Sequence, residues 1–381
     1  MSRTKNILYT VFFLLFIVSA YGQSTSAEED KKGKGLRIFF HPQKFYRKYF
    51  PDIKIKKPDV DSLYIKSYPN LFTTGAHLIS PSISLNLYSK SNAINASEAT
   101  SKFRTNIGNI LAFSGSYRYI AAGFAVVLSS NNKGSNYTET RYRTATIKYN
   151  GSAYSLQFKY ARTKGFTDIN GYNSVNNNNQ YTNRDDLLER EYQFEGIYNF
   201  SWKKYSYYAP LDYTQRQLKT RMGFLIKAGV YYNQLSGDSN LLTVAQRPYF
   251  EDFNNIKTIR STSFKIAPGL GINLVFLRRF YLSASIFVPY NLYFYKYLNE
   301  DDIKSSEGAS IAKVLDGSAV LGYQSKRFYA GLRYQFYSKQ ADFKSVGMKS
   351  LFSYFSIDLG YRFKAPKILK RIYKKTMPPG M

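Results

Sequence analysis

The stretch from Asn109 to Ser129 restricts the possible folds of this chain more than any other. Apolar and small polar residues alternate on both sides of a short turn at residues 119–121. Alternation with a period of two around a tight turn predicts an antiparallel hairpin. Its polar face carries Ser114, Ser116 and Arg118 rather than a dense row of charges, which favours a narrow enclosed lumen over bulk water. On the other face, the side chains expected to contact lipid are Phe113, Tyr117, Phe124 and Val126.

Composition supports strands with one apolar and one polar face. Aromatic residues make up 18% of the 381 residues, yet the mean hydropathy is only −0.38. Half-lipid-facing strands give this combination, whereas a helical membrane protein would show long apolar runs. The absence of cysteine excludes a disulfide scaffold, a thiol nucleophile, a cysteine-based metal site and an acylated lipoprotein cysteine.

The formal net charge of +29 favours binding to anionic partners. Such a charge fits nucleic acid, but the leader described next predicts export, so no nucleic-acid partner is expected. The predicted partners are outer-membrane lipids, including anionic lipopolysaccharide-type head groups, and the barrel-assembly machinery during biogenesis. Part of the charge lies in two basic segments, residues 31–57 and 364–375. A role only in solubility or in adhesion to an anionic surface is the alternative.

Residues 1–22 have the pattern of a secretory signal peptide. Arg3 and Lys5 precede an apolar run at 7–18, and small residues lie at the cleavage positions around Ala20 and Gly22. The run is shorter than the about 20 residues that span a membrane. We expect cleavage near Gly22 and export to the outer membrane of a Gram-negative bacterium, with an uncleaved anchor as the alternative.

Three further segments follow the leader. Residues 23–60 form a basic and aromatic lead, which reads as a surface-lying amphipathic helix, an unstructured periplasmic lead or a lumen plug. Residues 61–363 form the predicted barrel. Residues 364–381 form a basic tail, which is either an inert extension or a contact site for a periplasmic partner.

Short turns alternate with long polar loops through residues 61–363, and many strands carry aromatic residues near their ends. Both features are typical of an outer-membrane barrel. Thirteen strands can be drawn, but bacterial single-chain barrels have even numbers, so we predict an all-β, transmembrane, antiparallel up-and-down barrel of about 12 (12–14) strands. A soluble β-sandwich is the alternative. We favour the membrane barrel, because a soluble sheet closed over this many strands could not fill its interior with side chains. Besides the hairpin and a strand at 83–88, the predicted strands are Thr140–Tyr149, Ala153–Thr163, Tyr192–Ser201, Tyr205–Thr214, Met222–Gln234, Ile259–Val275, Phe280–Tyr295, Lys313–Gln324, Phe328–Ser338 and Leu351–Phe363. Of these, Tyr205–Thr214 runs in the wrong direction for a spanning strand.

Several motifs resemble a family of uncharacterised outer-membrane barrels of the Bacteroidota, a domain of unknown function. They are DSLYIKSYP at 61–69, FRTN at 103–106, YARTKGF at 160–166, TQRQLKT at 214–220 and GYRF at 360–363. The family usually reads KSAGS where this chain has KTRMG at 219–223, so that motif is partly lost. The resemblance implies an outer-membrane barrel and offers no activity to inherit.

Residues for catalysis are few. His41 and His77 are the two histidines, and no spacing of His, Cys or carboxylates suggests a metal site. A serine–histidine pair acting on lipid would have to use His77 with Ser80 or Ser82, and no orienting acid is visible beside them. No catalytic residue, metal or cofactor is therefore predicted, and His77 is expected to be an ordinary interfacial or lumen residue.

The face opposite the aromatic residues supplies the candidate functional residues. A mixed-charge interior is either a network of buried pairs that closes the barrel or a polar path for small solutes. We predict a non-enzymatic barrel with a constricted or plugged lumen, acting as a narrow channel or as a structural or binding component of the envelope. A lipid-modifying enzyme (a hydrolase or acyltransferase) and an adhesion or envelope-assembly module are the alternatives. The lumen candidates are Ser114, Ser116, Arg118, Gln157, Lys159, Gln193, Glu195, Arg333, Gln335, Asp358 and Arg362.

Overall fold

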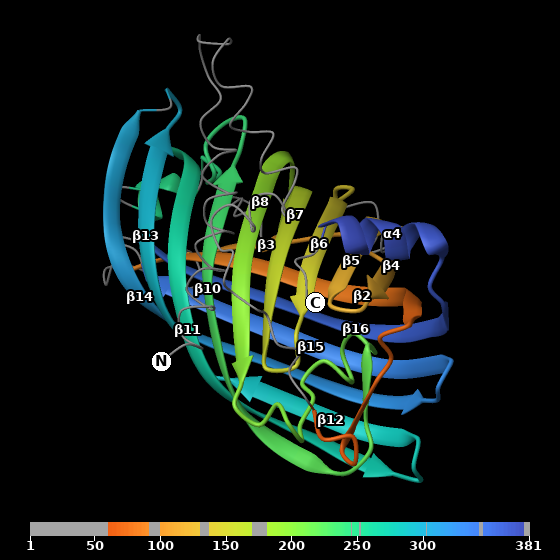
Figure 1. The fold of residues 1–381 in the computed structure, drawn as a ribbon. Helices are drawn as coiled ribbons and strands as arrows, with labels where there is room; N and C mark the ends of the chain where they lie inside the picture. Colours follow the sequence, from red (N-terminus) through yellow and green to blue (C-terminus); the bar gives the residue numbers. More distant parts are fainter. Residues whose placement is uncertain are drawn as a thin grey trace, which may run out of the picture. The chain divides into compact units, whose positions relative to one another are not determined.

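The computed structural model describes residues 60–90, 100–129, 137–169, 181–244, 246–250, 253–301, 303–342 and 346–376. Residues 60–364 form one compact unit. Its main sheet has 14 strands that close into a barrel (Figure 1). Around the ring the order is β2, β4, β5, β6, β7, β8, β10, β11, β12 with β13, β14, β15 and β16, which pairs again with β2. Strand β3 lies off this ring, and β12 and β13 share one place in it, so the wall has twelve strands. The strands are β2 (Leu71–Ser89), β3 (Thr100–Arg104), β4 (Ile110–Tyr117), β5 (Ile120–Val127), β6 (Arg141–Asn150), β7 (Tyr154–Asp168), β8 (Thr182–Asn199), β10 (Arg221–Ser236), β11 (Ile256–Phe276), β12 (Phe280–Phe287), β13 (Tyr290–Asn299), β14 (Lys304–Gln324), β15 (Phe328–Asp342) and β16 (Val346–Lys364).

Strands β12 and β13 form a single wall strand that is interrupted at Pro289. Phe287 pairs with Gly269 of β11, and Tyr290 pairs with Ile266, so the register does not change across the break. Proline has no N–H to donate to the ladder, which explains a local interruption without a turn.

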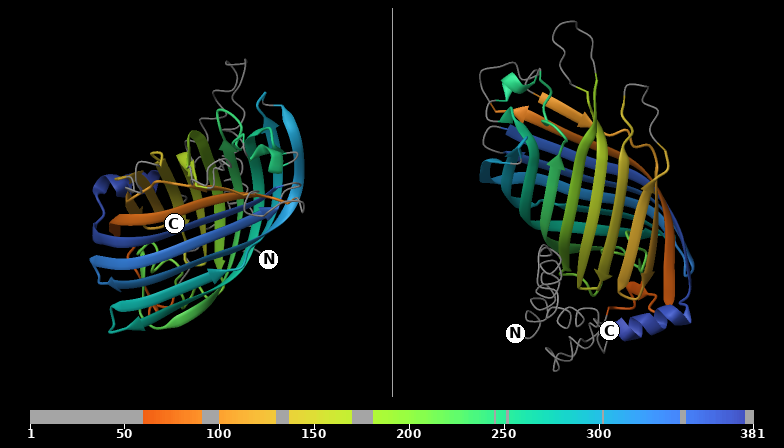
Figure 2. Two further views of the ribbon diagram at one scale, coloured as in Figure 1. Left: turned by 180° about the vertical axis from the view of Figure 1, so that it is seen from behind. Right: turned by 90° about the horizontal axis from the view of Figure 1, so that it is seen from above.

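The first and last wall strands close the ring. β2 and β16 pair antiparallel from Leu71 opposite Lys364 to Ser89 opposite Val346. One end of the barrel, the short-turn end, carries tight connections such as 118–119, 277–279 and 325–327 together with one long connection at 200–220. The opposite, long-loop end carries most of the other long connections (Figure 2).

Strands β4, β5 and β6 are short and end before the long-loop end of the barrel. At that end β3 takes their place between β2 and β7, pairing with residues 84–88 of β2 and with Thr167 and Asp168 of β7. The Asp168 carboxylate accepts the Lys102 backbone N–H at 3.0 Å. Strand β3 thus continues the wall above the three short strands.

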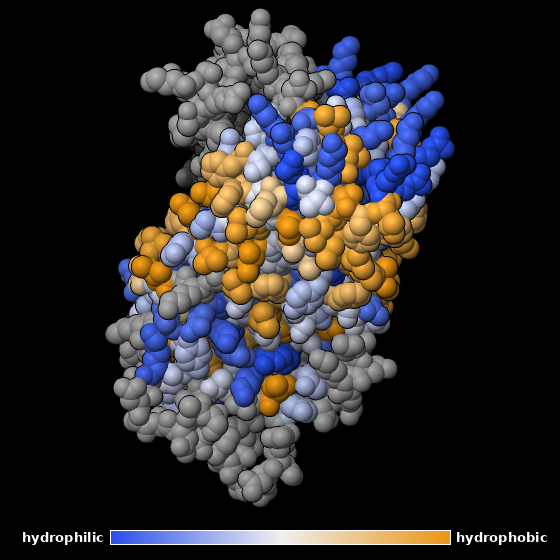
Figure 3. Space-filling view, turned by 90° about the horizontal axis from the view of Figure 1, so that it is seen from below, coloured by the Kyte–Doolittle hydropathy of each residue, from blue (hydrophilic) through white to orange (hydrophobic). Residues whose placement is uncertain are grey.

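Apolar side chains face outward around the barrel. On β11 every second residue from Phe264 to Phe276 is apolar, and Ile266 on this face is 57% exposed. A tilted transmembrane strand needs about 9–11 residues, which this run supplies. Figure 3 shows apolar side chains gathered in a broad band over the barrel, with hydrophilic side chains on both sides of the band. The prediction of an all-β barrel with a lipid-facing exterior is confirmed.

Strands β4 and β5 form the hairpin predicted at Asn109–Ser129. Phe113, Phe124 and Val126 are 41%, 57% and 43% exposed on the outer surface. Tyr117 belongs to the same face but is buried, with the Arg118 guanidinium 5.6 Å from its ring centre. The turn is Arg118–Tyr119, one residue earlier than predicted, and Arg118 has a φ of 54°.

Two strand predictions were wrong. Residues 205–214 form no wall strand, and their place is described below. Strand β3 (residues 100–104) lies between the predicted strand at 83–88 and the hairpin, where no strand was predicted, because five residues of mixed polarity are too few to show a period.

The second unit comprises residues 1–59 and 365–381. Its described part contains α4 (Lys367–Thr376), a basic helix with Ile368 and Ile372 exposed. The predicted signal peptide and the basic lead up to residue 59 lie outside the described residues. Among the helices that are described, none has the length and apolar content to cross a membrane.

A charge placed on the outer face tests the lipid contact. Leu270 lies at the centre of the apolar run of β11, so Leu270→Arg should lower the free energy of unfolding by about 2–4 kcal/mol. The same change at Leu277, 78% exposed in the turn after β11, should cost at most about 0.5 kcal/mol. Urea unfolding in lipid vesicles, followed by heat-modifiable gel migration, measures both. Equal losses for the two variants would contradict a lipid-facing Leu270.

Candidate functional site

A segment of the chain folds into the barrel at its short-turn end. Residues 201–214, here called the inner segment, follow β8 and lead into β9 (Gln215–Gln217), which pairs with β1 (Ile65–Ser67) in a small separate sheet. Tyr205 and Tyr213 are each only 1% exposed and pack with inward-facing wall residues. This is the stretch predicted as a strand, and it fills the lumen instead of crossing the membrane.

Glycines in the wall make room for the tyrosines of the inner segment. A Cβ atom added at Gly223 of β10 or Gly271 of β11 would overlap the Tyr205 side chain, and one at Gly331 of β15 would overlap the Tyr213 hydroxyl. Glycine within a strand often marks such a close approach. The fit between ring and glycine therefore holds the inner segment in one position.

The long-loop end is filled by the connection between β10 and β11. Leu241, Leu242 and Phe253 are at most 1% exposed and pack against inward side chains of the wall, including Leu87 and Tyr297. The Gln246 side chain donates to the Asp168 carboxylate at 2.9 Å. The lumen is thus narrowed at both ends by the chain's own segments.

Between these two fillings lies a cavity of about 410 Å³, here called the chamber. Six basic side chains, Arg333 and five lysines, line it together with six acidic ones and His77. These charges balance, so the net charge of +29 is not concentrated in the lumen. On the side of β2, β4 and β5 the lining is instead small or apolar, with Ile79, Ile110 and Ala125 among its residues.

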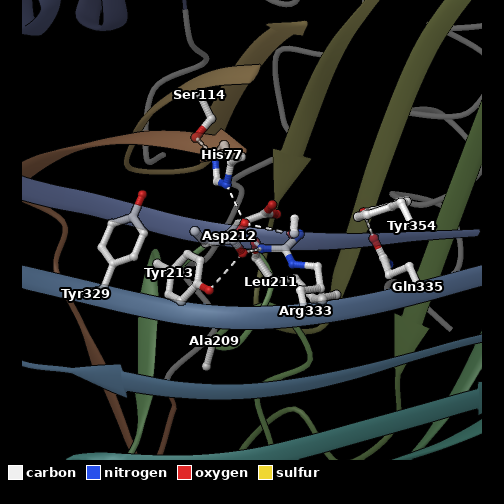
Figure 4. Close-up of polar contacts among 12 residues, drawn as sticks. His77, Ser114, Ala209, Leu211, Asp212, Tyr213, Tyr329, Arg333, Gln335 and Tyr354 are labelled. Carbon is white, nitrogen blue, oxygen red and sulfur yellow. Dashed lines mark hydrogen bonds and ion pairs between the residues drawn. The ribbon is translucent and has the colours of Figure 1, made fainter. Parts of the chain in front are cut away.

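Three adjacent strands bring Ser114, His77 and Asp358 together on the chamber wall, and Figure 4 shows Ser114 and His77 next to each other. His77 on β2 lies directly opposite Asp358 on β16, and its Nδ1 is 2.8 Å from the Asp358 Oδ1 atom. The Nε2 atom of His77 is 2.8 Å from Oγ of Ser114 on β4. A carboxylate only accepts hydrogen bonds, so Nδ1 carries a proton and, in the neutral ring, Nε2 accepts the Ser114 hydroxyl.

Asp358 is fully buried and receives four hydrogen bonds. Its Oδ1 atom accepts from His77 and from Ser356 at 3.0 Å, and its Oδ2 atom accepts from Tyr213 at 3.0 Å and Arg333 at 2.5 Å. These use the capacity of a carboxylate, which has about four acceptor sites. Tyr213 belongs to the inner segment, and burial raises the pKa of its hydroxyl far above the usual range, so it stays a donor.

Arg333 connects the same network to the inner segment a second time. Its Nη2 atom also donates to the Leu211 carbonyl at 2.7 Å, while its buried Nε–H has no hydrogen-bond partner among the described residues. Arg333 and Tyr213 both donate to the Asp358 carboxylate, and Figure 4 shows these two side chains below His77 and Ser114. The orphan Nε–H is a donor for which a ligand or a water molecule can supply the acceptor.

A second charged cluster lies across the chamber on β8, β10, β11 and β14. Lys227 donates to Asp316 at 2.6 Å and lies 3.7 Å from Glu195, and Lys265 is 3.9 Å and 3.8 Å from the same two carboxylates. Tyr231 also donates to Glu195. Two lysines and two acids neutralise one another, which offsets the cost of removing them from water.

Of the eleven lumen candidates, nine line the chamber. Arg362 faces inward below it, fully buried, with its Nε atom donating to the Tyr213 carbonyl at 3.0 Å and its Nη1 atom donating to that of Ser325 at 2.8 Å. Arg118 lies in the β4–β5 turn and is not among the lining residues. The nine are Ser114, Ser116, Gln157, Lys159, Gln193, Glu195, Arg333, Gln335 and Asp358.

Sequence reasoning missed the grouping of these residues and several of their partners. His77 had been weighed with Ser80 and Ser82, but both point to the outer face of β2. The period of two could have excluded them, since residue 77 and residues 80 and 82 differ in parity. Lys227, Lys265 and Asp316 alternate with apolar neighbours in predicted strands, and the same rule could have found them.

Comparison with known proteins places the chain in a family. Residues 59–363 match the model of the domain of unknown function DUF4421, which covers most of the sequence, and the chain belongs to this family. The resemblance noted in the sequence is confirmed as far as this domain, while an origin in the Bacteroidota stays a prediction. The search of curated proteins found no match.

Among solved structures, outer-membrane barrels resemble the chain at very low identity. The outer membrane protease OmpT of Escherichia coli is 9% identical, with 78% of this chain and 98% of that chain covered and a TM-score of 0.33. The COG4313 outer membrane channel of Pseudomonas putida F1 is 11% identical, with 81% and 100% covered and a TM-score of 0.35. The translocator domain of the autotransporter NalP of Neisseria meningitidis is 13% identical, with 76% and 88% covered and a TM-score of 0.33. The fold assignment therefore rests on the ring of paired strands itself.

Asp358 should be critical for stability. Asp358→Asn removes the charge that compensates buried Arg333, and breaking a buried pair of this kind costs about 3–5 kcal/mol of unfolding free energy. Asp342→Asn is the matched control, because Asp342 lies at the end of β15 with only an exposed hydrogen bond from Tyr88, and it should cost at most about 0.5 kcal/mol. Urea unfolding of the folded barrel measures both, and a loss below 1 kcal/mol at position 358 would refute the role of the network.

Proposed function

We propose that this protein is an outer-membrane barrel that binds a small molecule in its chamber and does not act as an open pore. The observation that carries the proposal is the filling of the lumen on both sides of a cavity of about 410 Å³. A cavity of this size falls in the range of small-molecule sites, about 300–1,000 Å³.

The membrane assignment is supported by the outward apolar face and by the unequal ends of the barrel. Outer-membrane barrels have short turns in the periplasm and long loops outside. We therefore place the short-turn end, with Arg118–Tyr119 and residues 325–327, in the periplasm. The inner segment then closes the lumen from the periplasmic side.

The lining indicates the chemistry of the ligand. Basic and acidic groups balance, so no strong selection for either charge is expected. The apolar wall with Ile79 and Ile110 and the unpaired Nε–H of Arg333 suit a molecule with an apolar portion and a hydrogen-bond acceptor. A narrow channel would need a path through both fillings, and a wide aqueous channel is typical of barrels with 16–18 strands.

A contact with anionic surfaces is a second proposal, carried by α4. Lys367, Lys370, Arg371 and Lys374 give the helix its charge, and exposed Ile368 and Ile372 give it an apolar side. Basic amphipathic helices lie on anionic lipid surfaces. Co-sedimentation with vesicles of anionic and of neutral lipid tests it, and equal binding to both would contradict it.

Conductance tests the closed lumen. In planar bilayers the wild-type barrel should show no steady open pore. The double variant Gly223→Ala with Gly271→Ala should raise the conductance, because the added Cβ atoms displace Tyr205 from its position in the lumen.

The control for this experiment is Gly196→Ala. A Cβ atom there would approach only the flexible end of Leu156, at 3.2 Å, so the conductance should stay at the wild-type level. A steady open pore in the wild type would overturn the proposed function.

A further inference from the structure

We propose that Ser114, His77 and Asp358 form a nucleophile, base and orienting acid that hydrolyse carboxylic esters with an apolar acyl group inside the chamber. The inference rests on the proposed function, since the chamber must admit a small molecule. Its geometric basis is the pair of 2.8 Å contacts, from Ser114 Oγ to His77 Nε2 and from His77 Nδ1 to Asp358 Oδ1. A nucleophile within hydrogen-bond reach of a base that a third group orients is the recognised signature of an activated serine.

The surroundings hold the histidine in the orientation that this chemistry requires. Ser356, Tyr213 and Arg333 hold the other acceptor sites of Asp358, so the carboxylate cannot rotate away from Nδ1. His77 is only 13% exposed, and its Nε2 lone pair is directed at Ser114. The inner segment adds two contacts to this network, from Tyr213 to Asp358 and from Arg333 to the Leu211 carbonyl, so His77 is held most firmly when that segment is in place.

Space for a substrate lies beside the serine. Ser114 lines the chamber and lies opposite Gly123 on β5, which has no side chain to cover it. On its other side it lies opposite Gly75 on β2, where the Tyr329 hydroxyl occupies the space that a Cβ atom would take. From Ser114 toward the long-loop end, the inward positions of the neighbouring strands are apolar, with Ala112 and Ile110 next along β4. This wall suits an acyl chain or another apolar carboxylic acid portion.

The reaction follows from these positions. Ser114 Oγ attacks the carbonyl carbon of the ester while its proton passes to Nε2 of His77. The bond to the alkoxy oxygen then breaks, and the alcohol leaves with the proton from His77. Water attacks the acyl–serine ester by the same proton transfers, which releases the acid and restores Ser114. Since the backbone amides of β4 and β5 are engaged in the ladder, side chains or water must stabilise the oxyanion, and we expect slow turnover.

Covalent labelling tests the nucleophile. The full-length barrel, refolded into vesicles and verified by heat-modifiable migration, is treated with phenylmethylsulfonyl fluoride and mapped by mass spectrometry. Ser114 should be modified, and Ser114→Ala should remove the label. Ser82→Ala is the matched control, because Ser82 lies on the outer face of β2 and its loss should leave the labelling unchanged.

Hydrolysis of p-nitrophenyl butyrate tests the base. His77→Ala should lower the rate by about 10²–10⁴-fold and should also remove the phenylmethylsulfonyl fluoride label from Ser114. Loss of a residue that only packs would leave a folded barrel that is still labelled. Only variants that migrate as folded barrels are compared. The test does not use Asp358→Asn, because that variant is expected to be destabilised.

The outcomes separate the two proposals. Binding of the slowly cleaved anilide N-(4-nitrophenyl)butanamide in equilibrium dialysis, with no modification of Ser114 and no ester hydrolysis, would overturn the triad and leave the binding barrel intact. A steady open pore with no binding would overturn both. Modification of Ser114 that depends on His77 would support both.

Discussion

The pairing of β2 with β16 is the interaction on which the rest of the structure depends. In lipid every backbone N–H and C=O must find a partner within the protein, and a sheet meets this condition only when its first and last strands join. Leu71 opposite Lys364 and Ser89 opposite Val346 mark the ends of this ladder. The same register sets His77 opposite Asp358, and a slip of β16 by one residue would turn Asp358 toward lipid and away from His77. Closure of the barrel and assembly of the candidate site are thus one event.

A ring of twelve strands leaves an interior that wall side chains alone do not fill. The chain fills it with two of its own segments, the inner segment at the short-turn end and the β10–β11 connection at the long-loop end. Both are held by polar contacts as well as by packing. Tyr213 and the Leu211 carbonyl bind the Asp358–Arg333 pair, and Gln246 binds Asp168. Buried polar networks of this kind favour one arrangement, because each partner lost leaves a further buried polar group unpaired.

This coupling gives the chamber a physical link to its closure at the short-turn end. If the inner segment moved out, Asp358 would lose one donor and Arg333 one acceptor. The His77 ring would then be held less firmly against Ser114. Opening of the lumen and loss of the candidate triad are expected to occur together.

Much of the wall could be predicted from the sequence. Phe113, Phe124 and Val126 lie on the lipid face as expected, and nine of the eleven lumen candidates line the chamber. Residues 205–214 misled the prediction because tyrosine is enriched in strands, whereas this segment forms turns, with the Leu211 and Asp212 backbone N–H groups both donating to the Tyr208 carbonyl. The triad was missed although Ser114 and Asp358 were both candidates, since nothing in the order of residues places positions 77, 114 and 358 side by side.

By itself, then, the sequence determined the closed antiparallel barrel and the two faces of its wall, because the alternation of side chains along a strand is a local property with a period of two. Only the tertiary structure decided which inward residues meet. Contacts between His77, Ser114 and Asp358 depend on the registers of β16, β2 and β4, and the filling of the lumen depends on glycines that lie far from Tyr205 in the chain. The Asn109–Ser129 hairpin shows both: its alternation directed Ser114 inward, and its register against β2 brought that serine to His77.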